Sequence, residues 1–389
     1  MKNKLGFIIK NWYIATIVVM FVAISLLSWA YSVRPMGRYM LSEMSDYNAD
    51  AAGDNKESVF SIVDREIRNL NDKWQIYKKK AIKKIDVYYT YVVTGEVASV
   101  QVLLGKNNWL FYKSNVDSDP IADYEGSNMY SSEQLDSMAQ STMEVQGKLE
   151  NMGIRFALIL PPNKETVYFE NMPENYFHCE NTRTDILVKT LQEQGVNAIS
   201  PKNRLLDEHM NYQLYYKYDT HWNQLGAYIG VKDVLSTWNI DIPELLERDV
   251  SENPLKGNYH YCGEDDLARL ADLLPVFDDE IEYFVEGTIP VDWEDFGDEQ
   301  EHKIISHIYN KNAPNIGRLL LVGDSFRTSM VPALSEVFSD VYVVHRNNYT
   351  PDIMESIKPG YLIVEYVERY SDSIKDISFL VEEDLNCMQ

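Results

Sequence analysis

The sequence predicts an α/β fold, a three-layer domain with a mostly parallel central sheet, preceded by one N-terminal transmembrane helix. Two observations lead to this prediction. From about residue 97 onward, short apolar segments alternate with longer amphipathic ones, which is typical of strands alternating with helices. Ahead of them, residues 11–33 form one uncharged apolar run, which is typical of a membrane span.

The first 33 residues are expected to form a cytoplasmic start and a membrane anchor. Lys2, Lys4 and Lys10 precede the apolar run. At about 1.5 Å per residue the run is long enough to cross a bilayer as a helix. Because positive flanks stay in the cytoplasm, the rest of the chain would lie outside the cell. A cleaved signal peptide is the alternative, since "SWA" at 28–30 resembles a cleavage site.

Two segments separate this anchor from the α/β domain. Residues 34–57 are polar and lack periodicity, which indicates a spacer. Residues 58–96 are expected to be an amphipathic helical segment that packs on the domain or leads into it. Its apolar residues recur at helical spacing, as at Val59, Ile67, Leu70 and Trp74. The α/β domain is then expected to span residues 97–389.

Within that domain the elements follow from apolar runs and their stop signals. The buried strand at 155–162, for example, is stopped by Pro161 and Pro162. Strands that alternate with helices imply a sheet covered on both faces. Strands are expected at 99–105, 107–114, 155–162, 197–201, 317–323, 340–345 and 361–367, and helices at 132–152, 184–195, 222–238 and 328–338.

An acidic insertion is expected around 264–301. This stretch holds fifteen acidic residues and one basic residue, Arg269. It lacks the alternating Asp and Asn ligands and the central Gly of a calcium loop, so no metal site is expected there. We interpret it as a solvated, partly helical insertion.

Charge and cysteine content exclude some classes of protein. Residues 1–34 contain four of the 36 basic residues and no acidic residue, which leaves 32 basic against 60 acidic residues and a net charge of −28. Such a surface repels nucleic acid, so a nucleic-acid partner is not expected. Three cysteines, Cys179, Cys262 and Cys387, suit an exported protein without a disulfide framework. One pair could form, and spacing does not say which.

A candidate nucleophile lies in "LLLVGDSFRTSM", residues 319–330. An apolar strand followed by Gly-Asp-Ser and a helix places Ser325 at the carboxyl edge of the sheet, where α/β folds bind ligands. The backbone N–H groups of Ser325 and Phe326 could stabilise an oxyanion there. The alternative is that Ser325 or Asp324 merely caps the helix.

The candidate base lies in "YYKYDTHW". Asp219 stands two residues before His221, and in an extended segment residues i and i+2 face the same side. An Asp bonded to one ring nitrogen leaves the other nitrogen to accept a serine proton. The alternative is that Asp219 or Thr220 caps the next helix while His221 packs beside Trp222. His345, at the end of the strand "VYVVH", is the reserve candidate for the base.

Five ordered segments resemble one family. "GKNNWLFYKSN" at 105–115, "LPPNKETVYFENMP" at 160–173, "DTHW" at 219–222, "GDSF" at 323–326 and "EYVER" at 365–369 are similar to the SGNH-hydrolase-like domain of alginate O-acetyltransferases of the AlgX/AlgJ type. The resemblance implies an SGNH-hydrolase-like fold and a catalytic triad of Ser325, His221 and Asp219. The expected architecture is closer to that of the membrane-anchored, single-domain members, since no carbohydrate-binding domain is expected after "EYVER". The family often has a small residue where this chain has Arg327.

The resemblance also implies a function, an extracytoplasmic O-acyltransferase, specifically an O-acetyltransferase, that modifies a cell-envelope polysaccharide through an acyl-serine intermediate. No bound cofactor is expected; the acetyl donor would come from outside the chain, delivered by a multi-pass membrane O-acyltransferase. A carbohydrate esterase with the same triad and a non-catalytic polysaccharide-binding scaffold remain alternatives, as does a metal hydrolase that uses Asp219, His221 and Asp324. The predicted pocket includes Trp222, Asp324, Arg327, Lys164 and His345.

Overall fold

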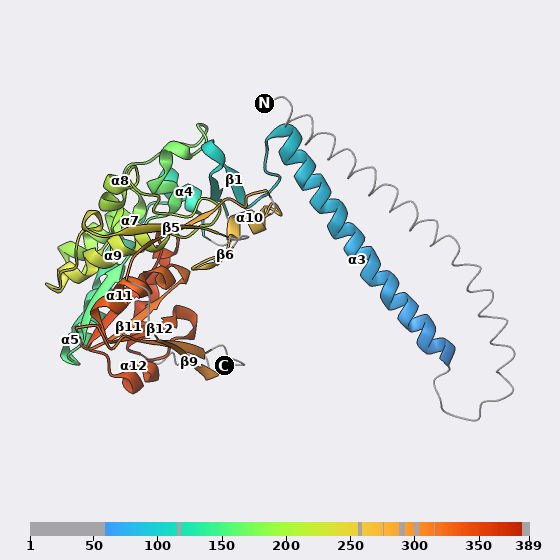
Figure 1. Cartoon of the computed structure of the whole chain (residues 1–389). Helices are drawn as coiled ribbons and strands as arrows, with labels where there is room; N and C mark the ends of the chain where they lie inside the picture. Colours follow the sequence, from blue (N-terminus) through green and yellow to red (C-terminus); the bar gives the residue numbers. More distant parts are fainter. Residues whose placement is uncertain are drawn as a thin grey trace. The chain divides into compact units, whose positions relative to one another are not determined.

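The computed structural model describes residues 59–114, 118–255, 259–274, 276–287, 292–298, 303–314 and 316–382 (Figure 1). The predicted anchor at 1–33 and the spacer at 34–57 lie outside these residues. Among the residues described, no helix combines the length and the apolar character needed to span a membrane. The helix predicted within 58–96 is α3 (Val59–Thr94). The chain divides inside it into two units, Met1–Lys83 and Lys84–Gln389.

The second unit is built on a seven-stranded sheet, which confirms the predicted α/β fold with a mostly parallel sheet. The strand order is β4-β3-β13-β11-β12-β10-β9. The first five strands are mutually parallel, and the last two pair antiparallel at one edge. Their bounds are β4 Ala198–Ile199, β3 Arg155–Ile159, β13 Tyr361–Glu365, β11 Arg318–Gly323, β12 Asp340–His345, β10 Lys303–Tyr309 and β9 Asp292–Asp298.

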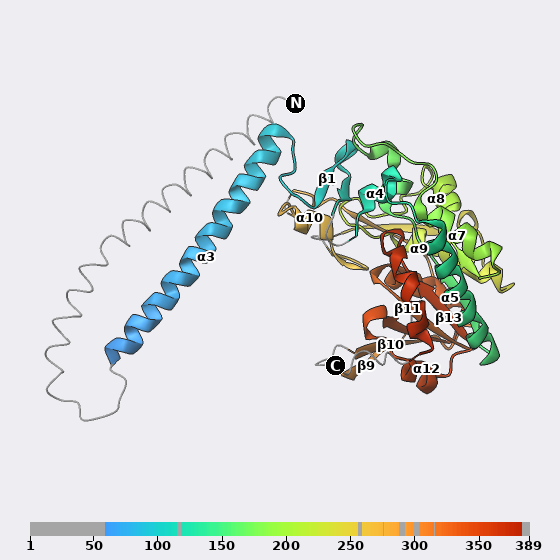
Figure 2. The ribbon, with the colours of Figure 1, turned by 180° about the vertical axis from the view of Figure 1, so that it is seen from behind.

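Helices cover both faces of the sheet, and side chains of the central strand β11 alternate between the two cores (Figures 1 and 2). Leu319 and Leu321 pack with residues of α9 and α11, whereas Leu320 and Val322 pack with residues of α5, α7 and α12. All four are fully buried, as expected for a parallel strand with a helix layer on each side. The helices are α5 Ser132–Asn151, α7 Arg183–Glu193, α9 Gln224–Thr237, α11 Val331–Val337 and α12 Pro351–Ile357.

Shorter elements surround the carboxyl edge of the sheet. The strands predicted at 99–105 and 107–114 form a separate two-stranded sheet, β1 (Val102–Leu104) with β2 (Leu110–Tyr112). The helix predicted at 328–338 starts earlier, as the 3-10 turn η5 (Ser325–Met330), which leads into α11. Other short helices are α4 Pro120–Glu125, α6 Lys164–Val167, α8 Lys202–Glu208, α10 Asp266–Leu270 and the 3-10 segment η7 Glu368–Leu380.

The acidic segment is partly helical, as predicted, and it also contributes strands and buried carboxylates to the domain. It contributes α10, strand β8 (Ile281–Val285), which pairs with β5 (Val250–Pro254), and the edge strand β9. Glu280 and Glu282 are buried because they accept hydrogen bonds from the chain just before His221. Tyr218 N–H donates to Glu280 at 2.8 Å, and the Tyr216 hydroxyl donates to Glu282 at 2.7 Å. Buried carboxylates with such donors support a loop instead of facing water.

Cys179 and Cys262 are free thiols. Cys387 lies outside the described residues, so the predicted choice of pair stays open.

Candidate active site

Ser325 stands where β11 ends. Gly323 pairs with Glu365 of β13 so closely that a Cβ on the glycine would come within 2.6 Å of the Glu365 carboxylate and 3.0 Å of its carbonyl oxygen. The chain then turns into η5, and Asp324 holds the turn by accepting Phe326 N–H on Oδ1 and Val367 N–H on Oδ2, both at 2.9 Å. Asp324 is buried, whereas Ser325 is exposed at the carboxyl edge of the sheet.

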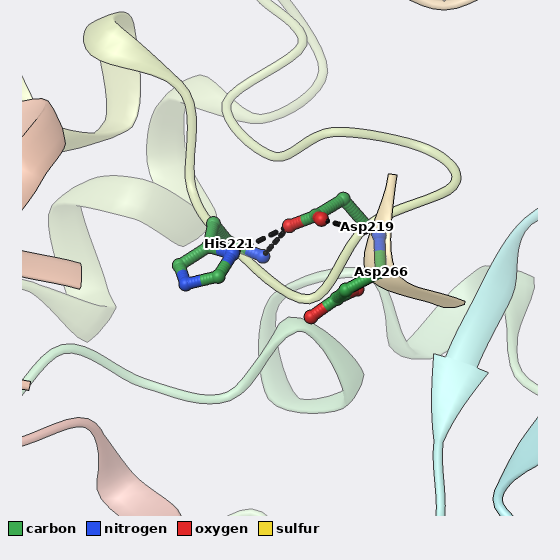
Figure 3. Close-up of side chains that lie close together, drawn as sticks. All are labelled: Asp219, His221 and Asp266. Carbon is green, nitrogen blue, oxygen red and sulfur yellow. Dashed lines mark hydrogen bonds and ion pairs between the residues drawn. The ribbon is translucent and has the colours of Figure 1, made fainter. Parts of the chain in front are cut away.

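Asp219 and His221 lie side by side in the loop before α9 (Figure 3). Asp219 Oδ1 is 2.5 Å from His221 Nδ1, and His221 Nε2 is 2.6 Å from the Ser325 hydroxyl. Helix α9 is capped by Asn223, whose side chain accepts from Leu225 N–H and Gly226 N–H. The cap predicted as an alternative use of Asp219 or Thr220 is therefore filled by another residue. The structure brings the three predicted triad residues together in one hydrogen-bonded chain.

The Asp219 carboxylate is fixed from two further sides. Its Oδ1 also accepts His221 N–H at 2.8 Å, and its Oδ2 accepts Asp266 N–H at 2.7 Å. His260 Nε2 lies 3.2 Å from Oδ2, and since His260 Nδ1 accepts Cys262 N–H, the proton is on Nε2. Burial alone raises the pKa of Asp219, but His221 and His260 hold that pKa well below its usual range. Asp219 therefore stays a carboxylate.

Sequence reasoning missed Asp266 and His260. Both belong to the irregular stretch around the acidic segment, more than forty residues from Asp219, and nothing in their local pattern points toward the site. Asp266 also braces the loop, since its carboxylate accepts the N–H and the hydroxyl of Thr220 at 2.8 and 2.6 Å. Burial and the neighbouring Asp219 raise the pKa of Asp266 to about 6.

Lys164, predicted to lie in the pocket, is buried and contacts the backbone of the loop at residues 216–221, which carries Asp219 and His221. Its Nζ donates to the carbonyl oxygens of Tyr216 and Lys217, both at 3.2 Å, and of Asp219 at 2.6 Å. Burial lowers the pKa of this ammonium to about 8. With three acceptors around it, Lys164 fixes the backbone that presents Asp219.

The other predicted pocket residues support the site. Trp222 is fully buried, and its indole N–H donates to the Phe326 carbonyl at 2.8 Å, so it cannot line a pocket. Arg327 donates to the Asp324 carbonyl. His345 Nδ1 accepts Asn347 N–H at 3.2 Å, and burial together with Arg327 lowers its pKa. His345 is not the residue that contacts Ser325.

One expected oxyanion donor is already engaged. The Phe326 N–H, predicted to face an oxyanion, donates to Asp324 Oδ1. Of the two expected backbone donors, only the N–H of Ser325 remains. A site for acyl transfer needs a further donor.

Among the described residues, one group of side chains lies close enough together to hold a metal ion (Figure 3). It consists of Asp219, His221 and Asp266. Their oxygens and the His221 Nδ1 already take part in the hydrogen bonds given above. An ion would have to displace those bonds. Asp324, which the metal-hydrolase alternative requires, is not in this group because it holds the η5 turn.

The described arrangement has the groups that can activate a serine hydroxyl. A carboxylate fixes the tautomer of the imidazole, the imidazole meets a serine hydroxyl, and the serine faces the surface. Such a chain of groups can activate the hydroxyl as a nucleophile and return its proton to a leaving group.

Comparison with solved structures finds several of similar chain trace. A DHHW family protein from Eubacterium siraeum is 16% identical, with a TM-score of 0.50 over 74% of this chain and 99% of that one. PatB1 of Bacillus cereus is 16% identical, with a TM-score of 0.48 over 70% and 96%. The O-acetyltransferase domain of AlgJ from Pseudomonas putida is 16% identical, with a TM-score of 0.43 over 74% and 95%.

No curated protein matches this chain in sequence. A family model does match, the SGNH hydrolase-like domain of the acetyltransferase AlgX, over residues 102–284. The matched residues include Asp219, His221 and Asp266, and they end before Ser325. Over these residues, somewhat less than half of the chain, the protein is similar to the SGNH hydrolase-like domain of the acetyltransferase AlgX.

Proposed function

We propose that this protein is an extracytoplasmic O-acetyltransferase that modifies a cell-envelope polysaccharide through an acetyl-serine intermediate on Ser325. The observation that carries the proposal is the continuous hydrogen-bonded chain from Asp219 through His221 to Ser325. Similarity to the domain of an acetyltransferase over residues 102–284 supports acetyl as the transferred group.

In the first half-reaction the Ser325 hydroxyl attacks the carbonyl carbon of an acetyl ester. Its proton passes to His221 Nε2, and the carbonyl oxygen takes the negative charge. When the tetrahedral intermediate collapses, His221 returns the proton to the leaving alcohol and acetyl-Ser325 remains. Asp219 stabilises the imidazolium without taking its proton.

In the second half-reaction a sugar hydroxyl replaces the leaving alcohol. His221 removes its proton, the hydroxyl attacks the acetyl carbonyl, and as the bond from the carbonyl carbon to the Ser325 oxygen breaks, His221 returns the proton to that oxygen. The exposed position of Ser325 suits a polymer, because a long chain needs open access to the acyl group.

The proposal includes the membrane context predicted from the sequence. Residues 11–33 would anchor the protein with its domain outside the cell, and a multi-pass membrane acyltransferase would supply acetyl groups there. No bound cofactor is part of the proposed cycle.

A carbohydrate esterase is the second candidate, and the exposure of Ser325 favours it specifically. Water reaches an exposed acyl-serine as readily as a sugar does, so hydrolysis competes with transfer. The scaffold alternative requires that the triad do no chemistry.

One experiment separates these candidates. The protein would be given 4-nitrophenyl acetate with and without candidate oligosaccharides, in parallel with Ser325→Ala. Acetylated sugar formed in preference to acetate supports the transferase, and acetate alone supports the esterase. If the wild type neither releases nitrophenol nor reacts with phenylmethylsulfonyl fluoride at Ser325, the enzymatic proposal fails.

A further inference from the structure

A buried arginine beside the triad lacks a partner. Arg369 follows β13 in η7 and is only 8% exposed. Its backbone N–H donates to the Asn163 side chain at 3.3 Å. Its guanidinium, by contrast, makes no hydrogen bond or ion pair with any residue that the structure describes, and its Nε is buried.

The Arg369 guanidinium and the imidazole of His221, the proposed base, both lie near the ring of Phe326. The guanidinium carbon Cζ is 5.2 Å from the centre of the Phe326 ring, and the His221 ring centre is 5.0 Å from that of Phe326. Phe326 is the residue next to Ser325. The rings of Tyr370 and Tyr112 lie 5.2 and 6.0 Å from Cζ and complete an aromatic surround. The guanidinium and the His221 ring thus share one neighbour, the side chain of the residue that follows Ser325.

The charges around Arg369 keep it ionised without occupying its donors. Burial opposes the charged form, but Asp324, Glu165 and Asp266 raise the pKa of the guanidinium. Each of these carboxylates accepts hydrogen bonds elsewhere, Asp324 from Phe326 and Val367, Glu165 from Tyr112 N–H, and Asp266 from Thr220. Arg369 therefore remains a cation whose N–H groups are directed at none of them.

Other arginines of the domain differ in this respect. Arg183, also buried, contacts Asp123 at 2.6 Å and Asp372 at 3.0 Å. Arg346 lies over two tyrosine rings but donates to the Ser373 hydroxyl at 2.6 Å. A buried cation without a partner is costly, so its retention points to a partner that arrives with the ligand.

We propose that Arg369 binds a negatively charged oxygen of the reacting ligand, the oxyanion that forms when Ser325 attacks the acyl carbonyl. This inference rests on the proposed function. In that step the Ser325 oxygen bonds to the carbonyl carbon, the hydroxyl proton moves to His221, and the carbonyl π electrons move onto oxygen. One of the two expected backbone donors, Phe326 N–H, is bonded to Asp324. The guanidinium supplies N–H groups that replace it.

The same chemistry could serve an anionic group on the acceptor, and the experiment distinguishes the two sources. Hydrolysis of 4-nitrophenyl acetate, a neutral donor, reports the oxyanion alone. Acetyl transfer from that donor to neutral glucose oligomers and to uronic-acid oligomers reports the acceptor. Wild type would be compared with Arg369→Gln, Arg369→Lys and Arg369→Ala, and with Arg346→Gln as the matched control.

For the oxyanion we expect kcat for 4-nitrophenyl acetate to fall roughly 10²-fold to 10³-fold in Arg369→Gln, with KM little changed. Arg369→Lys should lose less, and millimolar guanidinium should restore part of the rate in Arg369→Ala, which a purely structural role would not allow. A rise in KM confined to uronic-acid oligomers would assign Arg369 to the acceptor.

If Arg369→Gln matches Arg346→Gln in both assays, the inference is overturned. The inference is also overturned if added guanidinium restores none of the rate of Arg369→Ala and if Arg369→Lys loses as much of the rate as Arg369→Gln. Wild-type modification of Ser325 by phenylmethylsulfonyl fluoride keeps this failure separate from failure of the proposed function. The proposed function fails only if the wild type itself does not react.

Discussion

The indole N–H of Trp222 donates to the carbonyl oxygen of Phe326 at 2.8 Å. Trp222 directly follows His221, and Phe326 directly follows Ser325. This one bond therefore joins the segment that carries His221, the proposed base, to the turn that carries Ser325, the proposed nucleophile.

Trp222→Phe removes that bond while it keeps most of the buried ring. A buried carbonyl would lose its donor, which costs about 1–3 kcal/mol of unfolding free energy. We expect modification of Ser325 by phenylmethylsulfonyl fluoride to slow about tenfold as the two segments loosen. Trp238→Phe, at a tryptophan that packs on Tyr361 away from the triad, should leave the rate unchanged. Equal rates in both variants would contradict the prediction.

Lys164→Met should remove the hydrogen bonds that hold the loop at residues 216–221. The carbonyl oxygens of Tyr216, Lys217 and Asp219 lose their common donor, so we expect a loss of at least about 2 kcal/mol in unfolding free energy and a large drop in Ser325 modification. Lys202→Met removes another largely buried ammonium, bonded to Glu180 and Asp185. It should lower the melting temperature with little effect on the rate, and a similar drop in rate there would count against a specific role for Lys164.

His260→Phe tests the second histidine at Asp219. Phenylalanine keeps the ring that stacks on Tyr216 at 3.9 Å but removes the Nε2 proton that faces Asp219. With the carboxylate less firmly held, we expect kcat for 4-nitrophenyl acetate to fall about tenfold. His307→Phe, which breaks a 3.1 Å contact to Asp340 on the outer strands, is the control and should keep full activity. An unchanged kcat in His260→Phe would show that Asp266 and His221 suffice.

Asp266→Asn should change the pH dependence of stability. The pKa of Asp266 is about 6 in the native state against a usual value of 3.8, so the native state binds its proton more tightly. The stabilisation that this tighter proton binding gives the native state is present below about pH 4 and is lost as pH rises through 6. Relative to wild type, the variant should therefore gain about 2–3 kcal/mol of unfolding free energy between pH 4 and pH 7. Urea unfolding at several pH values measures it; a pH-independent difference would refute the assignment.

Features of this structure can be predicted from the sequence where a pattern of neighbouring residues reveals them. The central strands have apolar interiors and end at clear stops, so β3, β11, β12 and β13 lie where their patterns place them. Asp219 and His221 are two residues apart, and their pairing follows from local geometry. Strand β9, by contrast, consists of "DWEDFGD", and an acidic edge strand lacks the apolar run that reveals a buried one.

The supporting residues of the site could not be predicted for a different reason. Lys164, Asp266 and Trp222 act through backbone carbonyls and N–H groups, which every residue possesses, so residue type does not reveal the partner. Lys164 and Trp222 were expected in the pocket because their segments resemble family segments. The structure places both in buried positions behind it.

The contacts that assemble the site also have a consequence for folding. His221 and Ser325 are 104 residues apart in sequence, Lys164 is 55 residues from Asp219, and Asp266 is 47 residues from it. Contacts of such long range form late, after the chain has closed large loops. We therefore expect a nascent or partly folded chain to carry Ser325 without His221 beside it, so that reaction of Ser325 with phenylmethylsulfonyl fluoride requires the completed domain.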